Sequence, residues 1–411
     1  MIEILRKTVF SERAESRGLL FLLAAFIVIL LPGSSAGGEL TARFSAELWT
    51  FPNKTEQQGQ ERHNESLAIQ PEYYHQFDGG SSFTIIPFYR YDRMDPERTH
   101  FDIREMNYQL ILDSFEFRIG AGKVFWGATE FVHLVDIINQ TDLVENLDGE
   151  DKLGQPMVQF VIPLDWGALD FFILPYFRER TFPGKDGRFR SSIPVDTDSA
   201  RYEDPDEEYH VDLAARLSGT AGMLDFGFSY FRGTGREPTL LPGIASDGSS
   251  IFIPLYELIK QGSVDLQAVA GAWLLKLEAL RRSGQGEAFY SYSSGVEYTF
   301  VGVWGSRLDL GVITEYAYDS RGAKAASGFQ KDIMLGFRLA VNDFSSTELL
   351  LGYAYDMDYD SQVVRAEGSR RVGNNARLSL EAGLFLDMDP ADVLYDLRND
   401  DYLAVMFSYY L

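Results

Sequence analysis

Two oppositely charged segments in the middle of the chain contain the residue types that could create a strong local electric field. Residues 127–154 are rich in carboxylates, and residues 178–190 are rich in arginine. Facing each other across a water-filled passage, such groups would select ions, because charges lining a constriction set selectivity. The alternative is that both segments are solvated outer loops, or that they pair with each other for structure. The candidate constriction residues are Glu130, Asp136, Asp142, Glu145, Asp148, Arg178, Arg180, Arg188 and Arg190.

A second pattern with possible chemistry is the pair His210 and Asp212, which share one face of an expected strand. A carboxylate can orient an imidazole as a general base, so a hydrolase is an alternative function. Polar residues are also expected on any wet strand face, and this explains the pair equally well. The sequence contains no metalloprotease pattern, phosphate loop or dinucleotide fingerprint. We therefore assign no catalytic residue and do not expect an enzyme.

Two groups of aspartates near the C-terminus could supply oxygen ligands. Calcium prefers such ligands, but neither group has the glycine and closing glutamate of a calcium-binding loop. We expect acidic loop tips, with an external Ca²⁺ as the alternative, and no cofactor. The groups are Asp356, Asp358 and Asp360, and Asp387, Asp389 and Asp392. The chain has no cysteine, which excludes disulfides, thiolate metal sites and cysteine nucleophiles.

The composition narrows the class of protein. The formal net charge of −24 argues against nucleic acid as a partner, because binding to it requires a basic surface. Tyrosine, phenylalanine and glycine are abundant, with 22, 30 and 37 residues. This combination suits strands that meet a lipid interface.

The first 36 residues have the pattern of a secretory signal peptide. Basic residues are followed by an uncharged apolar run, residues 19–31, and then by Ser34 and Ala36 at the small-residue positions of a cleavage site. We predict cleavage after Ala36, leaving residues 37–411 as one domain. An uncleaved membrane anchor is the alternative, although the run is shorter than the ~20 residues that span a bilayer.

The remainder of the chain alternates between apolar and polar residues with a period of two. From Leu40 to Leu48, for example, every second residue is apolar and the residues between are mostly polar. A soluble sandwich also alternates, but these strands run about 10 residues or more, the length of a tilted membrane strand. The pattern predicts an all-β fold, a single transmembrane antiparallel up-and-down barrel of about 16 strands, in a range of 14 to 18.

Short and long connections separate the expected strands, as they do in membrane barrels. Residues 250–262 are ambiguous and could form a strand or a short helix. The tight turns are expected at residues 78–80, 113–114, 165–167, 219–222, 304–306, 342–343 and 374–375, and the long segments at 52–66, 127–154, 179–207 and 233–250.

The last eleven residues end the chain on an alternating strand whose apolar face runs from Leu403 to Leu411. Gram-negative barrels close on such a strand, which their assembly machinery recognises, although they usually end in Phe. We therefore expect the outer membrane of a Gram-negative bacterium as the location, with outer-membrane lipids and the barrel assembly machinery as partners.

A short stretch adds a family resemblance. The run from Gly122 to Gly127 contains Trp126, and it is followed by Asp136, Asn139 and Pro156. This resembles a family of uncharacterised Gram-negative outer-membrane proteins with a Trp-Gly pair and a downstream Asp-x-x-Asn, although Gln140 stands where the family often has proline. The resemblance implies a porin-like barrel, a channel for passive uptake of small solutes, apolar compounds among them. A hydrolase and a structural or adhesion barrel are the alternatives.

Overall fold

A computed structural model describes residues 38–411 except 56, 58 and 326; the expected signal peptide lies outside the described residues. Eighteen strands form one sheet, and three others form a small separate sheet. The strands are β1(Gly38–Thr50), β2(His63–Gln76), β3(Ser81–Asp92), β4(His100–Leu112), β5(Phe115–Gly122), β6(Gln155–Leu164), β7(Gly167–Leu174), β8(Arg201–Tyr202), β9(Asp212–Ala221), β10(Leu224–Thr234), β11(Thr239–Ile244), β12(Ser250–Tyr256), β13(Leu258–Ala270), β14(Trp273–Gly284), β15(Gly286–Phe300), β16(Asp309–Asp319), β17(Lys331–Ala340), β18(Glu348–Asp356), β19(Gln362–Val372), β20(Ala376–Leu386) and β21(Tyr402–Tyr410). Five single-turn 3-10 helices lie in the connections, at Thr197–Ser199, Glu207–Tyr209, Val303–Gly305, Gly322–Lys324 and Tyr395–Leu397.

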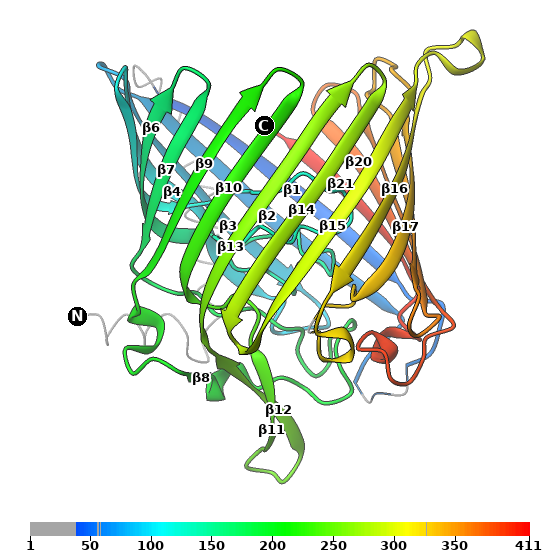
Figure 1. Cartoon of the computed structure of the whole chain (residues 1–411). Coiled ribbons are helices and arrows are strands. Elements are labelled where there is room, and N and C mark those ends of the chain that lie inside the picture. Colours follow the sequence, from blue (N-terminus) through cyan, green and yellow to red (C-terminus); the bar gives the residue numbers. More distant parts are fainter. Residues whose placement is uncertain (1–37, 56, 58, 326) are drawn as a thin grey trace.

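The large sheet is a closed antiparallel barrel (Figure 1). Each strand pairs with its sequence neighbours in the sheet, and the last strand, β21, pairs with the first, β1. The closing register places Arg43 opposite Tyr410 and Thr50 opposite Leu403. Closure satisfies the backbone hydrogen bonds of every barrel strand, as an apolar surrounding requires.

The two faces of the strands differ as the alternation predicted. Apolar side chains point outward and are exposed, for example Leu67 at 61% and Phe407 at 45%. Polar side chains point inward, where Ser45 and Ser408 share a hydrogen bond across the β1–β21 seam. The described residues contain no helix long and apolar enough to cross a membrane.

The favoured number of 16 strands is too low by two, although 18 lies within the expected range. The short turn that the sequence did not predict is the one between β13 and β14, at residues 271–272, and long connections such as residues 93–99 and 357–361 were also not predicted. This turn has a single glycine, Gly271, with φ of +64°, inside an otherwise apolar run, so the sequence shows no polar break there. Residues 250–262 form strands and not a helix.

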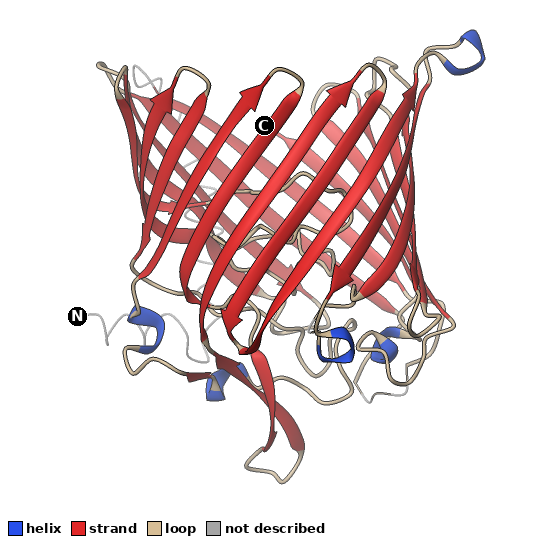
Figure 2. Ribbon diagram, in the orientation of Figure 1, coloured by secondary structure: helices blue, strands red, loops and turns tan. Residues whose placement is uncertain are grey.

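The connections at the two ends of the barrel differ in length (Figure 2). Most turns at one end have two to four residues, and the long connections gather at the other end. The hairpin β11–β12 projects from the long-loop end and pairs with β8 (Figure 1). The connection between β5 and β6 is an exception, since it turns back into the barrel.

Candidate functional site in the barrel lumen

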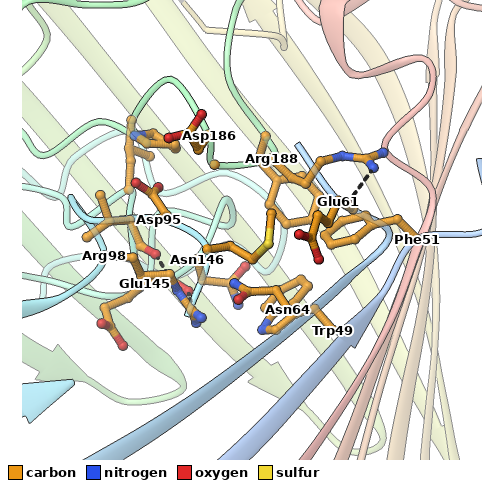
Figure 3. A pocket seen from close by; sticks show the side chains of 16 residues that line it. Trp49, Phe51, Glu61, Asn64, Asp95, Arg98, Glu145, Asn146, Asp186 and Arg188 are labelled. Atoms are coloured by element: carbon orange, nitrogen blue, oxygen red, sulfur yellow. Dashed lines mark hydrogen bonds between the residues drawn. The ribbon is translucent and has the colours of Figure 1, made fainter. Parts of the chain in front are cut away.

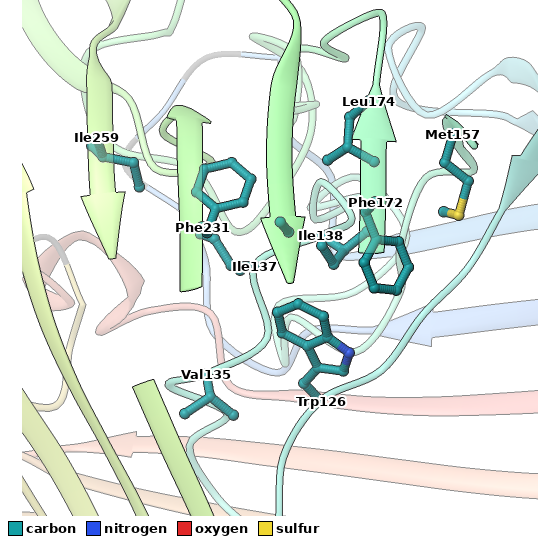
Figure 4. Close-up of a cluster of buried hydrophobic side chains, with 10 residues drawn as sticks. Trp126, Val135, Ile137, Ile138, Met157, Phe172, Leu174, Phe231 and Ile259 are labelled. Atoms are coloured by element: carbon teal, nitrogen blue, oxygen red, sulfur yellow. The ribbon is translucent and has the colours of Figure 1, made fainter. Parts of the chain in front are cut away.

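Residues 123–154, which we call the lumen loop, leave β5 and fold into the interior of the barrel. Their apolar side chains pack against inward-facing residues of the wall (Figure 4). Val135, Ile137 and Ile138 are buried here, and the Trp126 ring contacts that of Phe172 with centroids 5.7 Å apart. An apolar core inside the lumen fixes the loop, because burial of these side chains favours the docked position. The wall contributes Met157, Phe172, Leu174, Ala214, Phe231 and Ile259.

The residues of the Trp-Gly and Asp-x-x-Asn motif fasten the base of the loop. Asn139 accepts a hydrogen bond from the backbone N–H of Val124 at 2.8 Å and donates to the carbonyls of Gly122 and Leu153. Asp136 pairs with Lys152 at 3.1 Å. The motif therefore has a structural explanation: it joins the two ends of the lumen loop.

Two wall glutamates hold the first turn of the loop. Glu278 of β14 accepts hydrogen bonds from the backbone N–H groups of Ala128, Thr129 and Val135 and from the Thr129 hydroxyl. Glu315 of β16 accepts the N–H groups of the next two residues, Glu130 and Phe131. Hydrogen bonds to ionised acceptors are strong, so these two carboxylates act as a clamp. Sequence reasoning missed both, because only the barrel brings them to the loop.

Glycine at two paired wall positions makes room for the tip of the loop. Gly336 of β17 lies opposite Gly352 of β18 in the register. A Cβ atom at either position would lie 3.0 Å or less from the ring of Phe131. The ring therefore rests on the backbone of these strands.

The carboxylates of the loop form ion pairs with basic residues of the wall. Glu130 lies 2.6 Å from Arg338 and 3.3 Å from Lys276. Asp148 lies 2.7 Å from Arg365 of β19. The loop thus spans the lumen and is held on several sides.

A buried network of ion pairs anchors residues 142–145, the far part of the lumen loop, to strands β1, β3 and β4. Glu145 binds Arg90 through both of its oxygens, and Asp142 binds Arg104 at 2.6 Å. Although burial opposes ionisation, contact with His100 and the charge of Arg104 hold the pKa of Asp142 well below its ordinary value. Arg90 likewise lowers the pKa of Glu145 against the effect of burial.

One group in the described part of the chain has donor atoms close enough to hold a metal ion. His100, Asp142 and Glu145 each offer a ligand atom, and these atoms lie within 4.8 Å of one another. Guanidinium groups already bind both carboxylates, since Arg90 contacts Glu145 and Arg104 contacts Asp142. We therefore interpret the group as a salt-bridge network and not as a metal centre.

The arginine segment lies next to the lumen loop, but its members have separate partners. Arg178 pairs with Asp102 of β4, and Arg188 pairs with Asp400. Arg180 donates its Nε–H to Gln140 at 3.3 Å, and Arg190 donates to backbone carbonyls of its own segment. In the described residues no ion pair joins these arginines to the carboxylates of the lumen loop. Contact between the segments includes a hydrogen bond from Thr181 to Asp142 at 2.7 Å.

A small cavity of about 40 Å³ marks the point where the arginine segment, the lumen loop and β1 meet (Figure 3). Arg98 and Glu145 line it on one side, and Arg188 and Phe51 line it on the other. Arg188 lies over the Phe51 ring, 4.2 Å from its centroid. At this size the cavity has room for about one water molecule, so it is a packing gap and not a solute site.

Larger cavities lie on the two sides of the lumen loop. Toward the short turns, a cavity of about 480 Å³ is bordered by Gly127 and Ala128 of the loop and by the Arg216–Asp265 ion pair of the wall. Toward the long loops, a cavity of about 460 Å³ contains charged groups of both signs beside apolar side chains. Its charged lining includes Glu130, Asp136, Asp148, Glu150, Lys152, Arg180, Arg236, Glu237, Arg282, Asp319, Arg321, Arg365 and Glu367.

His210 and Asp212 do meet, with Nδ1 2.9 Å from the carboxylate. The other ring nitrogen, Nε2, faces a second carboxylate, Asp204, at 3.9 Å. Asp212 itself is buried and also pairs with Arg236 at 2.8 Å. In a catalytic triad the second nitrogen would face a nucleophile, so this arrangement is that of a structural ion pair.

The aspartates near the C-terminus make hydrogen bonds and ion pairs that hold surface turns in place. Asp356 accepts the backbone N–H groups of Asp358 and Tyr359, and Asp358 pairs with Lys331 at 3.0 Å. Asp389 and Asp392 accept N–H groups within their turn. Such bonds are those of acidic turn residues.

Comparison with solved structures identifies the fold. A BenF-like porin from Pseudomonas fluorescens Pf-5 is similar, with a TM-score of 0.53 and 11% identity, over 91% of this chain and 98% of that one. The chain has the barrel fold of outer-membrane porins. OccK8 (OprE) of Pseudomonas aeruginosa is similar to the same degree, with a TM-score of 0.53 and 12% identity over 91% and 98% of the two chains.

Sequence comparisons add nothing to this fold assignment. No protein-family model matches the chain, and no curated protein matches it. The resemblance of residues 122–156 to an uncharacterised outer-membrane family therefore stays a prediction.

Proposed function

We propose that this protein is an outer-membrane channel for the passive uptake of small solutes, with the lumen loop as its constriction. The observation that carries the proposal is the path of that loop. It crosses the lumen, is fastened to the wall by ion pairs and an apolar core, and has a cavity on each side. An aqueous passage is expected in a barrel of this size unless a segment fills it.

The exterior supports placement in a membrane. Outward-facing side chains of the strands are large and apolar, which water would disfavour and lipid would accept. Together with the expected signal peptide, this favours the outer membrane as the location, with its lipids and the assembly machinery as partners.

The cavity of about 460 Å³ toward the long loops, which we call the loop-side cavity, indicates what kind of solute fits. Charged groups of both signs lie beside Phe131, Leu134 and Phe385. A small solute with both a polar group and an apolar part would find partners for each. Since the charges nearly balance, we expect weak ion selectivity that single substitutions shift.

Single-channel conductance in planar bilayers tests the proposal. The purified folded protein should give stable steps in salt solution, and the reversal potential in a salt gradient measures its selectivity. A folded barrel that leaves the membrane current at baseline would contradict the channel.

The two alternative functions have their own readouts. A hydrolase would cleave lipid or peptide substrates and lose this activity in His210→Ala. The second carboxylate facing His210 disfavours that outcome. A structural or adhesion barrel would show neither conductance nor turnover.

A further inference from the structure

The side chain of His100 lies where the wall meets the far part of the lumen loop. Its Nδ1 is 3.0 Å from the backbone carbonyl of Arg98, a contact that fits an Nδ1–H donor. This turns Nε2 toward the loop, where Asp142 and Glu145 each place a carboxylate oxygen 3.6 Å away. A neutral ring would direct its lone pair at two oxygens, whereas an imidazolium would direct a positive N–H at them.

Without a positive charge on His100, the carboxylates around it outnumber the guanidinium groups. The largely buried ion-pair network that includes Asp142 and Glu145 contains four guanidinium groups and five carboxylates. An imidazolium at position 100 supplies the missing positive charge and joins the two halves of the network. The other members are Arg90, Arg98, Arg104, Arg178, Glu47, Asp92 and Asp102.

We propose that His100, in its imidazolium form, is a positioning residue that holds the lumen loop across the barrel, and that the loop loosens when this side chain loses its proton. The inference rests on the proposed function only in that the loop is the constriction. The contacts of His100 with the lumen loop do not depend on whether the barrel conducts ions.

Groups from β3, from β4, from the connection between them and from the lumen loop surround the His100 side chain. Arg90 and the Phe88 ring come from β3, the ring centroid lying 5.6 Å from that of the histidine. Arg104 comes from β4 itself, the Arg98 carbonyl comes from the connection between β3 and β4, and Asp142 and Glu145 come from the lumen loop. Asp151 is a nearby loop carboxylate: partial desolvation inside the lumen, and then the charges of Glu145 and Asp148, raise its pKa to about 6.

The direction of the pH effect follows from the protonation state of His100 that binds the loop, which is the imidazolium. Imidazole titrates near pH ~6.5 when unperturbed, and the two carboxylates that face His100 stay ionised well below this pH because their pKa values are lowered. The anchor is therefore complete below that pH and is lost as the pH rises through the titration of His100.

A spin label on the loop measures this without any need for conductance. The chain has no cysteine, so Leu147→Cys provides a single attachment site on the loop. In the full-length protein folded into lipid vesicles, the label should be immobile at pH ~5 and mobile at alkaline pH, with a midpoint above ~6.5.

Four variants decide the role of the side chain. His100→Gln should give a mobile label at every pH, and His100→Lys, which stays charged, should keep it immobile to higher pH. Asp151→Asn should retain the transition if His100 causes it, as should His133→Gln, which removes the histidine of the loop itself. An unchanged profile in His100→Gln, or no transition in the parent protein, would overturn the proposal.

Conductance recorded over the same pH range separates the two proposals. A channel whose current becomes noisier as the label becomes mobile supports both. A barrel that is silent at every pH but shows the label transition overturns the channel and leaves the positioning role of His100 supported.

Discussion

Phe131 of the lumen loop rests on Gly352 of strand β18, where a Cβ atom would lie 2.8 Å from the phenyl ring. The paired Gly336 on β17 approaches the same ring, with a Cβ distance of 3.0 Å. The wall is therefore shaped for one aromatic side chain of the loop, and this contact sets how far the loop extends across the lumen.

Gly352→Val should displace the tip of the loop. The added side chain would overlap the Phe131 ring, and crowding of this kind typically costs about 1–3 kcal/mol. We expect larger and noisier conductance steps and a lower unfolding temperature.

A matched control is available on another strand of the wall. Gly262 of β13 has open space around it, with no atom within 4 Å of a Cβ. Gly262→Val should leave the conductance unchanged. Equal effects of the two valines would show that the Phe131 contact does not position the loop.

Glu278→Ala should release the first turn of the loop. The substitution leaves three buried or partly buried N–H groups without their acceptor, at roughly 1–3 kcal/mol for each unsatisfied group. We expect proteases to cleave the lumen loop of the folded barrel, as detected by gel electrophoresis and mass spectrometry. Glu287→Ala removes an exposed glutamate at the long-loop end of β15, and it should leave the loop protected.

Two neutralising substitutions in the loop-side cavity should shift ion selectivity in opposite directions. Arg180→Gln removes a positive charge and should favour cations, whereas Glu150→Gln removes a negative charge and should favour anions. Reversal potentials in a salt gradient measure both shifts. Arg190→Gln is the comparison, because Arg190 bonds to its own segment and does not line this cavity. A shift with Arg190→Gln as large as that with Arg180→Gln would argue against this cavity as the ion path.

Asn139→Ala should weaken the base of the lumen loop. It removes one hydrogen-bond acceptor and two donor contacts, which join Val124, Gly122 and Leu153. Asn139→Asp keeps the acceptor but places a carboxylate oxygen against the carbonyls of Gly122 and Leu153, so its effect on urea unfolding should be at least as large as that of alanine. Stability equal to that of the parent protein in both variants would contradict a fastening role for this asparagine.

Much of the barrel could be predicted from local pattern. Alternation from Leu40 to Leu48 determines which side chains face outward, because successive strand residues point to opposite faces. The same pattern identified the closing strand that ends at Leu411. The turn at Gly271 escaped prediction, since a single glycine in an apolar run looks the same as a continuing strand.

The functional site depended on tertiary structure. The sequence located the carboxylates of residues 127–154, and it located the arginines of residues 178–190. It could not show that Asp148 pairs with Arg365, more than 200 positions away, or that Glu278 accepts the N–H of Thr129. Closing the barrel brings distant wall residues around one lumen, so the partners of each charge are decided by strand position and register, which composition and spacing along the chain do not contain.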